Sequence, residues 1–255
     1  HHRLYEFAKA ALIKIFAFPY ATVCDMYCND TDKWGEAQIG HYIGIDHELW
    51  ENKWKHFTAE FIKLNPSADD FEAQLQEKDI VCCMQNLQLC FESEEQAKKL
   101  LNNVSSLLKP GGYFLGIIPD SSTIWTKYQK NVEASHNKKT VPNSIRSENY
   151  TITFEIEEEK FPFFGKKYQL KFANEHCLVH FPSLMRLARE AGLEYVEIQN
   201  LTDFYDDNRP QFAPMLNLVD PRGKLIARSY DILGLYSIFV FQKPDPDAIP
   251  PIVTP

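Results

Sequence analysis

Apolar positions in the first half of the chain alternate between a helical period and short continuous runs. Residues 3–16 place apolar side chains along one stripe of a helix, and Pro19 ends that helix. Short apolar runs predict buried strands at 21–27, 40–46, 79–87 and 113–118.

Polar segments between these runs predict further helices. Ser67 stands before two acidic residues and an apolar period through Leu75, which is typical of a helix start. Residues 92–108 form a long amphipathic pattern, which the predicted turn Lys109-Pro110-Gly111-Gly112 ends. Strands that alternate with helices at this spacing predict an α/β fold, a mostly parallel sheet with helices on both faces.

The middle of the chain changes to a period of two. Apolar residues alternate at Tyr150, Ile152, Phe154, Ile156, Tyr168, Leu170 and Phe172. The segment 161–167 between the two runs predicts a turn with exposed aromatic residues, so we expect a β-hairpin inserted into the α/β chain. The predicted organisation is a single domain over 1–243 with the hairpin at 149–172, followed by a Pro-rich tail at 244–255.

The last part of the chain returns to the alternation of helices and strands. A helix is predicted over 182–191 with Gly192 as its C-cap, and a strand over 194–198 follows. The apolar segment 235–242 is predicted to close the sheet.

Charge and composition limit the classes of function. The 255 residues carry a net charge of −8, which excludes a generally basic coat for nucleic acid. Residues 121–172 nevertheless hold nine Lys or Arg against six Asp or Glu, which indicates either a solvated face or a local site for a phosphate-bearing ligand. No apolar run approaches the roughly 20 residues of a membrane span, and no signal peptide is recognisable.

The six cysteines predict free thiols in a reducing compartment. Their spacings form no paired Cys-x-x-Cys framework, and two of them are adjacent in an apolar run, so metal ligation is the weaker alternative. The six are Cys24, Cys28, Cys82, Cys83, Cys90 and Cys177.

Two acidic residues mark the ends of the first two predicted strands. Asp25 lies late in the first, and Asp46 ends the second, where a carboxylate can accept both ribose hydroxyls of a nucleotide cofactor or can cap the next helix. A dinucleotide site needs G-x-G-x-x-G after the first strand, but residues 28–32 read Cys-Asn-Asp-Thr-Asp. This argues against NAD; a ribose-binding acid at this place is shared by dinucleotide-binding proteins and S-adenosylmethionine enzymes.

Several segments together resemble, in order and over nearly the whole chain, those of the mRNA cap guanine-N7 methyltransferases, most closely divergent plant-type members. The family's PGGYF-x-G-x-x-P-N-S stands here as Pro110–Gly116 followed by Pro119-Asp120-Ser121. Its YPLFG-x-KY hairpin resembles Phe161–Tyr168. The other matching segments are Phe91-Glu92-Ser93, Leu178–Pro182, Phe204-Tyr205 and Tyr236–Lys243.

The resemblance implies a Rossmann-like, seven-stranded class I S-adenosylmethionine-dependent methyltransferase with an inserted β-hairpin. The implied reaction moves the methyl group of S-adenosylmethionine to N7 of the guanosine cap of mRNA and leaves S-adenosylhomocysteine. N7 carries no proton, so neither a general base nor a metal is expected, and catalysis should come from proximity, orientation and a suitable electrostatic field.

The resemblance also carries site residues over by position. It implies that Lys9 holds the cofactor carboxylate, Asp46 the ribose and Asn65 the adenine side. The implied cofactor-binding residues are Lys9, Asp25, Tyr27, Asp46, Asn65, Met84 and Leu89. The implied cap-binding residues are Lys33 near the phosphates, Gln88, Pro119, Glu175, His176 and Tyr236.

The chain departs from the family's pattern at several of these positions. Met84, Gln88 and Leu89 replace Gln, His and Tyr, and His176 takes the place of the guanine-binding Glu, with Glu175 one residue earlier. Tyr5-Glu6 stands where the family has an Asn-Asn pair, and the glycine-rich first loop is nearly absent. Either internal loop residues are missing, at joints near Asn29, Asp46, His136, Ala173 and Met215, or the pocket has diverged.

Three interpretations of function stay open. The first is a cap methyltransferase in the nucleus, acting as a monomer on capped RNA without a membrane, with the need for a protein activator undecided. The second is a non-catalytic paralogue that binds RNA or a partner methyltransferase. The third is a methyltransferase with a small-molecule acceptor.

Overall fold

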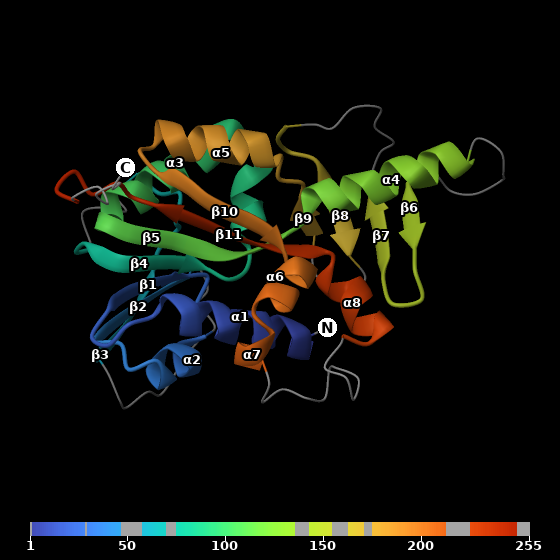
Figure 1. Cartoon of the computed structure of the whole chain (residues 1–255). Helices are drawn as coiled ribbons and strands as arrows, with labels where there is room; N and C mark the ends of the chain where they lie inside the picture. Colours follow the sequence, from blue (N-terminus) through green and yellow to red (C-terminus); the bar gives the residue numbers. More distant parts are fainter. Residues whose placement is uncertain are drawn as a thin grey trace, which may run out of the picture.

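The computed structural model describes residues 2–28, 30–46, 58–69, 75–135, 143–154, 163–170, 175–212 and 225–248. Their centre is a seven-stranded sheet in the order β10-β11-β5-β4-β1-β2-β3 (Figure 1). The strands are β1 Thr22–Met26, β2 His41–Asp46, β3 Thr58–Lys63, β4 Lys78–Cys83, β5 Leu108–Pro119, β10 Glu194–Asn200 and β11 Tyr236–Gln242.

The first five strands are parallel; β11 runs antiparallel to β5, and β10 runs antiparallel to β11. The chain leaves β1 toward β2 and β3, then crosses back to place β4 on the other side of β1. The strand order therefore reverses between β1 and β4. In open parallel sheets, ligands bind outside the carboxyl ends of the strands at such a reversal.

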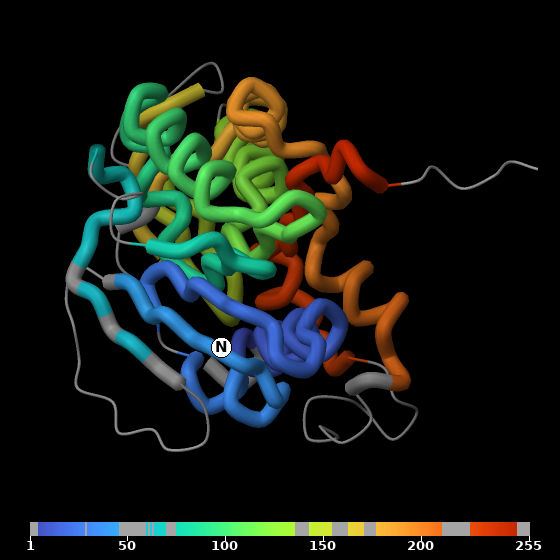
Figure 2. The backbone as a smooth tube through the Cα atoms, turned by 90° about the vertical axis from the view of Figure 1, so that its left-hand side faces the viewer, coloured from blue at the N-terminus to red at the C-terminus, as the bar shows by residue number. Residues whose placement is uncertain are grey.

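Helices cover both faces of the sheet, as the alternation predicts. In both views α1 His2–Phe16 and α2 Thr31–Glu36 lie on one side, and α3 Glu94–Leu107 and α5 Phe181–Glu190 on the other (Figure 1 and Figure 2). Each side has its own apolar core, which includes Phe7 and Leu12 of α1 on the first and Leu100 of α3 on the second. The short helices α6 Leu201–Asp207, α7 Arg209–Phe212 and α8 Ala227–Leu233 lie near α1 (Figure 1).

The predicted hairpin is the centre of a second, four-stranded antiparallel sheet. Its strands are β6 Ser144–Arg146, β7 Thr151–Phe154, β8 Lys167–Leu170 and β9 Glu175–Cys177. The sequence did not predict β6, β9 or α4 Ser121–Ser135, whose Trp125 and Tyr128 pack on Phe154. Phe163 in the predicted turn is 58% exposed, as expected, whereas Phe161 lies outside the described residues.

Two predicted boundaries differ from the structure. The strand predicted over 79–87 ends at Cys83, because Asn86 adopts a left-handed conformation (φ 66°) and the short 3-10 helix η2 Leu87–Glu92 begins directly after it. The predicted turn 109–112 lies inside β5 as a bulge, where the register with β4 slips between Lys78 and Ile80. Gly111 permits this bulge with a φ of +79°.

Other predicted features are confirmed or lie outside the described part. Gly192, with a φ of +88°, ends α5 as predicted, and Ser93 caps α3 by accepting a hydrogen bond from the Gln96 N–H. Most of the helix predicted after Ser67 lies outside the described residues. So do Asn29, His136, Ala173 and Met215, four of the five joints where residues were expected to be missing.

Gly116 sits where β5 passes closest to the end of β4. A Cβ there would lie 1.9 Å from the Cys83 carbonyl oxygen and 2.8 Å from the Phe239 ring. We therefore expect Gly116→Ala to lower the free energy of unfolding by about 3 kcal/mol, measured by urea denaturation, because β4 and β5 must move apart. Gly234→Ala, whose nearest neighbour is an ordinary 3.4 Å away, is the matched control and should change stability by less than about 0.5 kcal/mol. Equal losses in the two variants would contradict this account.

Candidate active site

The carboxyl ends of four parallel strands bring together most of the residues predicted to bind a cofactor. Tyr27 directly follows β1, Asp46 is the last residue of β2, Asn65 follows β3 closely, and Met84 directly follows β4. Because β1–β4 are neighbouring parallel strands, these positions share one edge of the sheet at the strand reversal. The side chain of Asp46 lies outside the described part.

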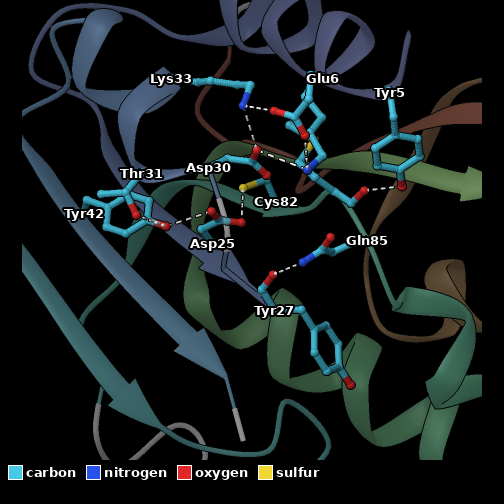
Figure 3. A network of polar contacts seen from close by, with 12 residues as sticks. Tyr5, Glu6, Asp25, Tyr27, Asp30, Thr31, Lys33, Tyr42, Cys82 and Gln85 are labelled. Atoms are coloured by element: carbon cyan, nitrogen blue, oxygen red, sulfur yellow. Dashed lines mark hydrogen bonds and ion pairs between the residues drawn. The ribbon is translucent and has the colours of Figure 1, made fainter. Parts of the chain in front are cut away.

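Asp25 is buried within β1, and its two carboxylate oxygens each accept a hydrogen bond from a neighbouring strand. The Tyr42 hydroxyl donates to Oδ2 at 2.7 Å, and the Cys82 thiol donates to Oδ1 at 3.2 Å (Figure 3). Burial, reinforced by the charge of Asp30, raises the pKa of Asp25 to about 7. Asp25 thus links β1 to both of its neighbouring strands, and its direct contact with a cofactor remains a prediction.

The turns after β1 and β4 are bonded to each other. Tyr27 has a left-handed backbone (φ 53°), and its carbonyl accepts a hydrogen bond of 3.0 Å from the Gln85 side chain (Figure 3). The Tyr27 hydroxyl lies 3.4 Å from the Cys90 sulfur in η2. The two turns that border the strand reversal therefore form one unit.

The segment expected on the adenine side is fixed against α3. The Asn65 side-chain oxygen accepts a hydrogen bond from the Ser67 N–H at 2.9 Å, which makes a tight local turn. Asn103 of α3 donates to the carbonyls of Pro66 and Ala68 at 2.8 and 3.0 Å. Leu89 of η2, a predicted cofactor-binding residue, is 38% exposed.

Lys9 and Lys33 share the same two acidic partners. Lys9 of α1, only 1% exposed, lies 3.2 Å from Glu6 and 3.1 Å from Asp30. Lys33 of α2 pairs with the other Glu6 oxygen and lies 3.1 Å from Asp30 (Figure 3). Burial alone would raise the Glu6 pKa, but the hydrogen bond from Lys33 and the charge of Lys9 hold it below its usual range. We call Glu6, Lys9, Asp30 and Lys33 the charge cluster.

The charge cluster lies where two ligand anions are expected. Lys9 is the predicted partner of the cofactor carboxylate, and Lys33 of the cap phosphates. A buried cation such as Lys9 needs an anionic partner, and a ligand carboxylate can exchange with one of the protein's own carboxylates. Sequence reasoning missed Asp30. Its segment, residues 28–32, was examined only for the glycines of a dinucleotide site.

On the acceptor side, Pro119 and Tyr236 are brought together as predicted. Pro119 ends β5 and pairs in register with Tyr236, the first residue of β11, which is 5% exposed. The ring of Tyr5 meets the Tyr236 ring edge-on, with centroids 5.2 Å apart, and its hydroxyl donates to the Met84 carbonyl (Figure 3 shows Tyr5). Gln88 of η2 is buried.

Strand β9 carries the two other predicted cap residues. In the pairing of β8 with β9, Glu175 is opposite Gln169 and His176 is opposite Tyr168. Burial raises the pKa of the Tyr168 hydroxyl well above its usual value, and Tyr236 raises it further. The side chains of Glu175 and His176 lie outside the described part, so their roles stay predictions.

Asp120 orients the segment between β5 and α4. One of its oxygens accepts the Thr123 N–H at 2.9 Å as a helix cap, and the other accepts from Asn200 at 2.9 Å and Ser237 at 2.7 Å. The sequence signal was the Pro119-Asp120-Ser121 segment, in which Asp120 was assigned no role.

All six cysteines are free thiols. Within the described ranges, no group of three or more His, Cys, Asp or Glu side chains is placed to hold a metal ion. In the same part of the chain, no helix has the length and apolar character needed to span a membrane.

Comparison with known proteins decides the family. Residues 2–243 match the profile of the mRNA (guanine-N(7))-methyltransferase domain. The chain belongs to the mRNA cap guanine-N7 methyltransferase family. It is 80% identical to mRNA cap guanine-N(7) methyltransferase 2 of Oryza sativa subsp. japonica, over all of this chain and 84% of that protein. It is 62% identical to the protein of the same name from Arabidopsis thaliana, over all of this chain and 80% of that protein.

Solved structures of other methyltransferases share the fold. An S-adenosylmethionine-dependent methyltransferase from Clostridium acetobutylicum superposes with a TM-score of 0.51 at 11% identity, over 96% of this chain and 92% of that one. A Burkholderia thailandensis 1,6-didemethyltoxoflavin-N1-methyltransferase, solved with S-adenosylhomocysteine, gives a TM-score of 0.51 at 14% identity, over 94% and 79%. This family member therefore has the class I S-adenosylmethionine-dependent methyltransferase fold that the resemblance implied.

The alignment with the rice relative bears on the short first loop. It extends over 283 positions, whereas this chain contributes 255 residues, so positions of the relative within the aligned region have no counterpart here. This agrees with missing loop residues as one cause of the scarce glycines. Missing residues do not explain why Gln88 replaces the family's His, because Gln88 lies in a continuous described segment between β4 and α3.

Proposed function

We propose that this chain transfers the methyl group of S-adenosylmethionine to N7 of the guanosine cap of mRNA. The observation that carries the proposal is one junction: Tyr5 joins the cofactor edge of β1–β4, through the Met84 carbonyl, to the pair of Tyr236 and Pro119 on the acceptor side. A methyl donor on one side and a planar base on the other would face each other there.

The residues at the cofactor edge fit S-adenosylmethionine by their chemistry. The buried ammonium of Lys9 suits a carboxylate, Asp46 at the end of β2 suits the ribose hydroxyls, and the amide of Asn65 suits the adenine edge. The bound cofactor supplies a sulfonium methyl group. The protein binds and orients it, and the bonded turns at Tyr27 and Gln85 keep that edge in one shape.

The acceptor side needs orientation more than proton transfer. N7 of guanine is a nucleophile without a proton, so a base is unnecessary, and the rate depends on how well the ring is held in line with the methyl group. The methylated base is cationic, and the face of an aromatic ring such as Tyr236 attracts a cation. Lys33, 21% exposed at its side chain, is oriented for the anionic cap phosphates once Glu6 releases it.

The proposal includes capped RNA as substrate, the nucleus as compartment and a monomer as the active form, acting without a membrane; a protein activator is left undecided. The favoured alternative is a regulatory paralogue, because His176 stands at the guanine-binding position, where a carboxylate would accept from N1 and N2 of guanine.

The decisive experiment supplies purified protein with radiolabelled S-adenosylmethionine and RNA that begins with GpppG. We expect label in N7-methylguanosine after nuclease digestion, and none with the matched ApppG-capped RNA or with free small acceptors. Calorimetry with S-adenosylhomocysteine accompanies the assay. Cofactor binding without methylation of capped RNA would contradict the proposal and favour the regulatory paralogue, and labelled small acceptors would favour a different substrate.

A further inference from the structure

Tyr5 contacts both halves of the candidate site. Its hydroxyl donates a hydrogen bond of 2.5 Å to the carbonyl of Met84, which directly follows β4 on the cofactor side. Its ring meets the Tyr236 ring on the acceptor side at a centroid distance of 5.2 Å and an interplanar angle of 74°. One side chain of α1 therefore links two segments that lie more than 150 residues apart in sequence.

The surroundings of Tyr5 hold its ring in one orientation. The Lys9 ammonium, fixed by Glu6 and Asp30, lies 5.2 Å from the centroid of the Tyr5 ring. Burial raises the pKa of Tyr5 well above its usual value, with a further contribution from Tyr236, so the hydroxyl stays protonated and remains a donor. The ring thus has a cation on one side, an aromatic partner on another, and a carbonyl at its tip.

The contact with Tyr236 has a geometric consequence. An edge-on aromatic pair is favoured over a face-to-face arrangement, so the Tyr5 ring sets the plane of the Tyr236 ring. A base that stacks on Tyr236 takes its own plane from that ring. The amide of an Asn, which the resemblance places at this position in the family, is too short to reach both Met84 and Tyr236.

We propose that Tyr5 is a positioning residue that sets the plane of the acceptor base through Tyr236 and ties it to the cofactor edge through the Met84 carbonyl. The proposal rests on the function proposed above, because it takes Tyr236 as part of the acceptor pocket. It assigns to α1 a role in acceptor orientation that is separate from the cofactor role of Lys9.

The experiment measures two equilibria by calorimetry, the Kd of S-adenosylhomocysteine and the Kd of GpppG with S-adenosylhomocysteine saturating. For Tyr5→Leu, which removes the ring, we expect the GpppG Kd to rise about tenfold, since an aromatic pair and the order it imposes are lost. For Tyr5→Phe, which keeps the ring and removes the hydroxyl, we expect a GpppG Kd within about twofold of wild type and an S-adenosylhomocysteine Kd raised about threefold.

A double-mutant cycle distinguishes positioning from a general loosening of the fold. In a Tyr236→Leu background, Tyr5→Leu should change the GpppG Kd by less than about twofold, because the ring through which it acts is gone. Phe16→Leu is the matched control on the same helix: its ring packs on Tyr113 instead of the pocket, so it should lower Tm without moving either Kd.

The outcomes separate this inference from the proposed function. Wild-type protein that methylates capped RNA, with a GpppG Kd unaffected by Tyr5→Leu, would overturn the inference alone. Fully additive effects of Tyr5→Leu and Tyr236→Leu would overturn it as well. Wild-type protein that binds S-adenosylhomocysteine but neither binds nor methylates GpppG would overturn the proposed function and this inference with it.

Discussion

Asp46→Ala should weaken the binding of S-adenosylhomocysteine by about 100-fold, because two charge-assisted hydrogen bonds to the ribose hydroxyls are lost together. Asp46 is the last residue of β2, next to the strand reversal where the cofactor edge lies. Calorimetry with purified protein measures the effect. The isosteric Asp46→Asn, which retains one acceptor, should lose less affinity.

Asp79 provides the matched control at the opposite edge of the same sheet. Its carboxylate accepts hydrogen bonds from the N–H and the hydroxyl of Thr22 and forms an ion pair with Lys109, near the amino ends of β1 and β4. We expect Asp79→Ala to lower Tm but to leave the affinity for S-adenosylhomocysteine unchanged. Unchanged affinity in Asp46→Ala would show that the ribose lies elsewhere.

The second large effect is a pH dependence of stability that comes from Asp25. Burial, and then the charge of Asp30, raises its pKa from 3.8 to about 7. Between these values the carboxyl is protonated in the folded state and ionised in the unfolded state, so the folded state binds more protons. The stabilising contribution is therefore complete below about pH 4 and is lost as pH rises through about 7.

Asp25→Asn removes this titration and supplies the measurement. The free energy of unfolding of the wild type, relative to Asp25→Asn, should fall by about 3 kcal/mol between pH 5 and pH 8 in urea titrations. Asp79→Asn is the flat control, because hydrogen bonds from Thr22 and Lys109 outweigh burial and hold the Asp79 pKa below its usual value, outside this pH range. A wild-type-minus-Asn difference for Asp25 that is the same at both pH values would refute the raised pKa.

The sheet could be predicted from sequence because its strands are buried on both faces. Cys24 in β1 and Val81 in β4 are fully buried within mostly apolar segments of a parallel sheet, and that pattern is visible without a partner strand. Strands β6 and β9, with three residues each, are too short to show a period. The end of β4 was predicted too late because an apolar residue, Leu87, follows closely. Leu87 is buried as part of η2, in the apolar core that contains α3, and not as part of a strand.

The residues of the candidate site also divide into those that sequence could predict and those that it could not. The place of Asp46 could be predicted because it ends a strand, whereas Asn65 was assigned from the resemblance alone. Tyr5 was noticed only as a departure from the family's pattern, since its contact with Tyr236 joins the two ends of the chain and leaves no local signal. Sequence does not show that Tyr42 and Cys82 donate hydrogen bonds to Asp25, whose contact with a cofactor stays a prediction.

The charge cluster has a consequence for product release. Its two lysines balance its two acids, so Asp46 at the end of β2 adds an acidic residue in excess at the cofactor edge. S-adenosylmethionine carries a positive sulfonium, and methyl transfer converts it to a neutral thioether. The reaction therefore removes one of the two positive charges of the cofactor, the sulfonium, and with it part of the electrostatic attraction between the cofactor and this acidic residue.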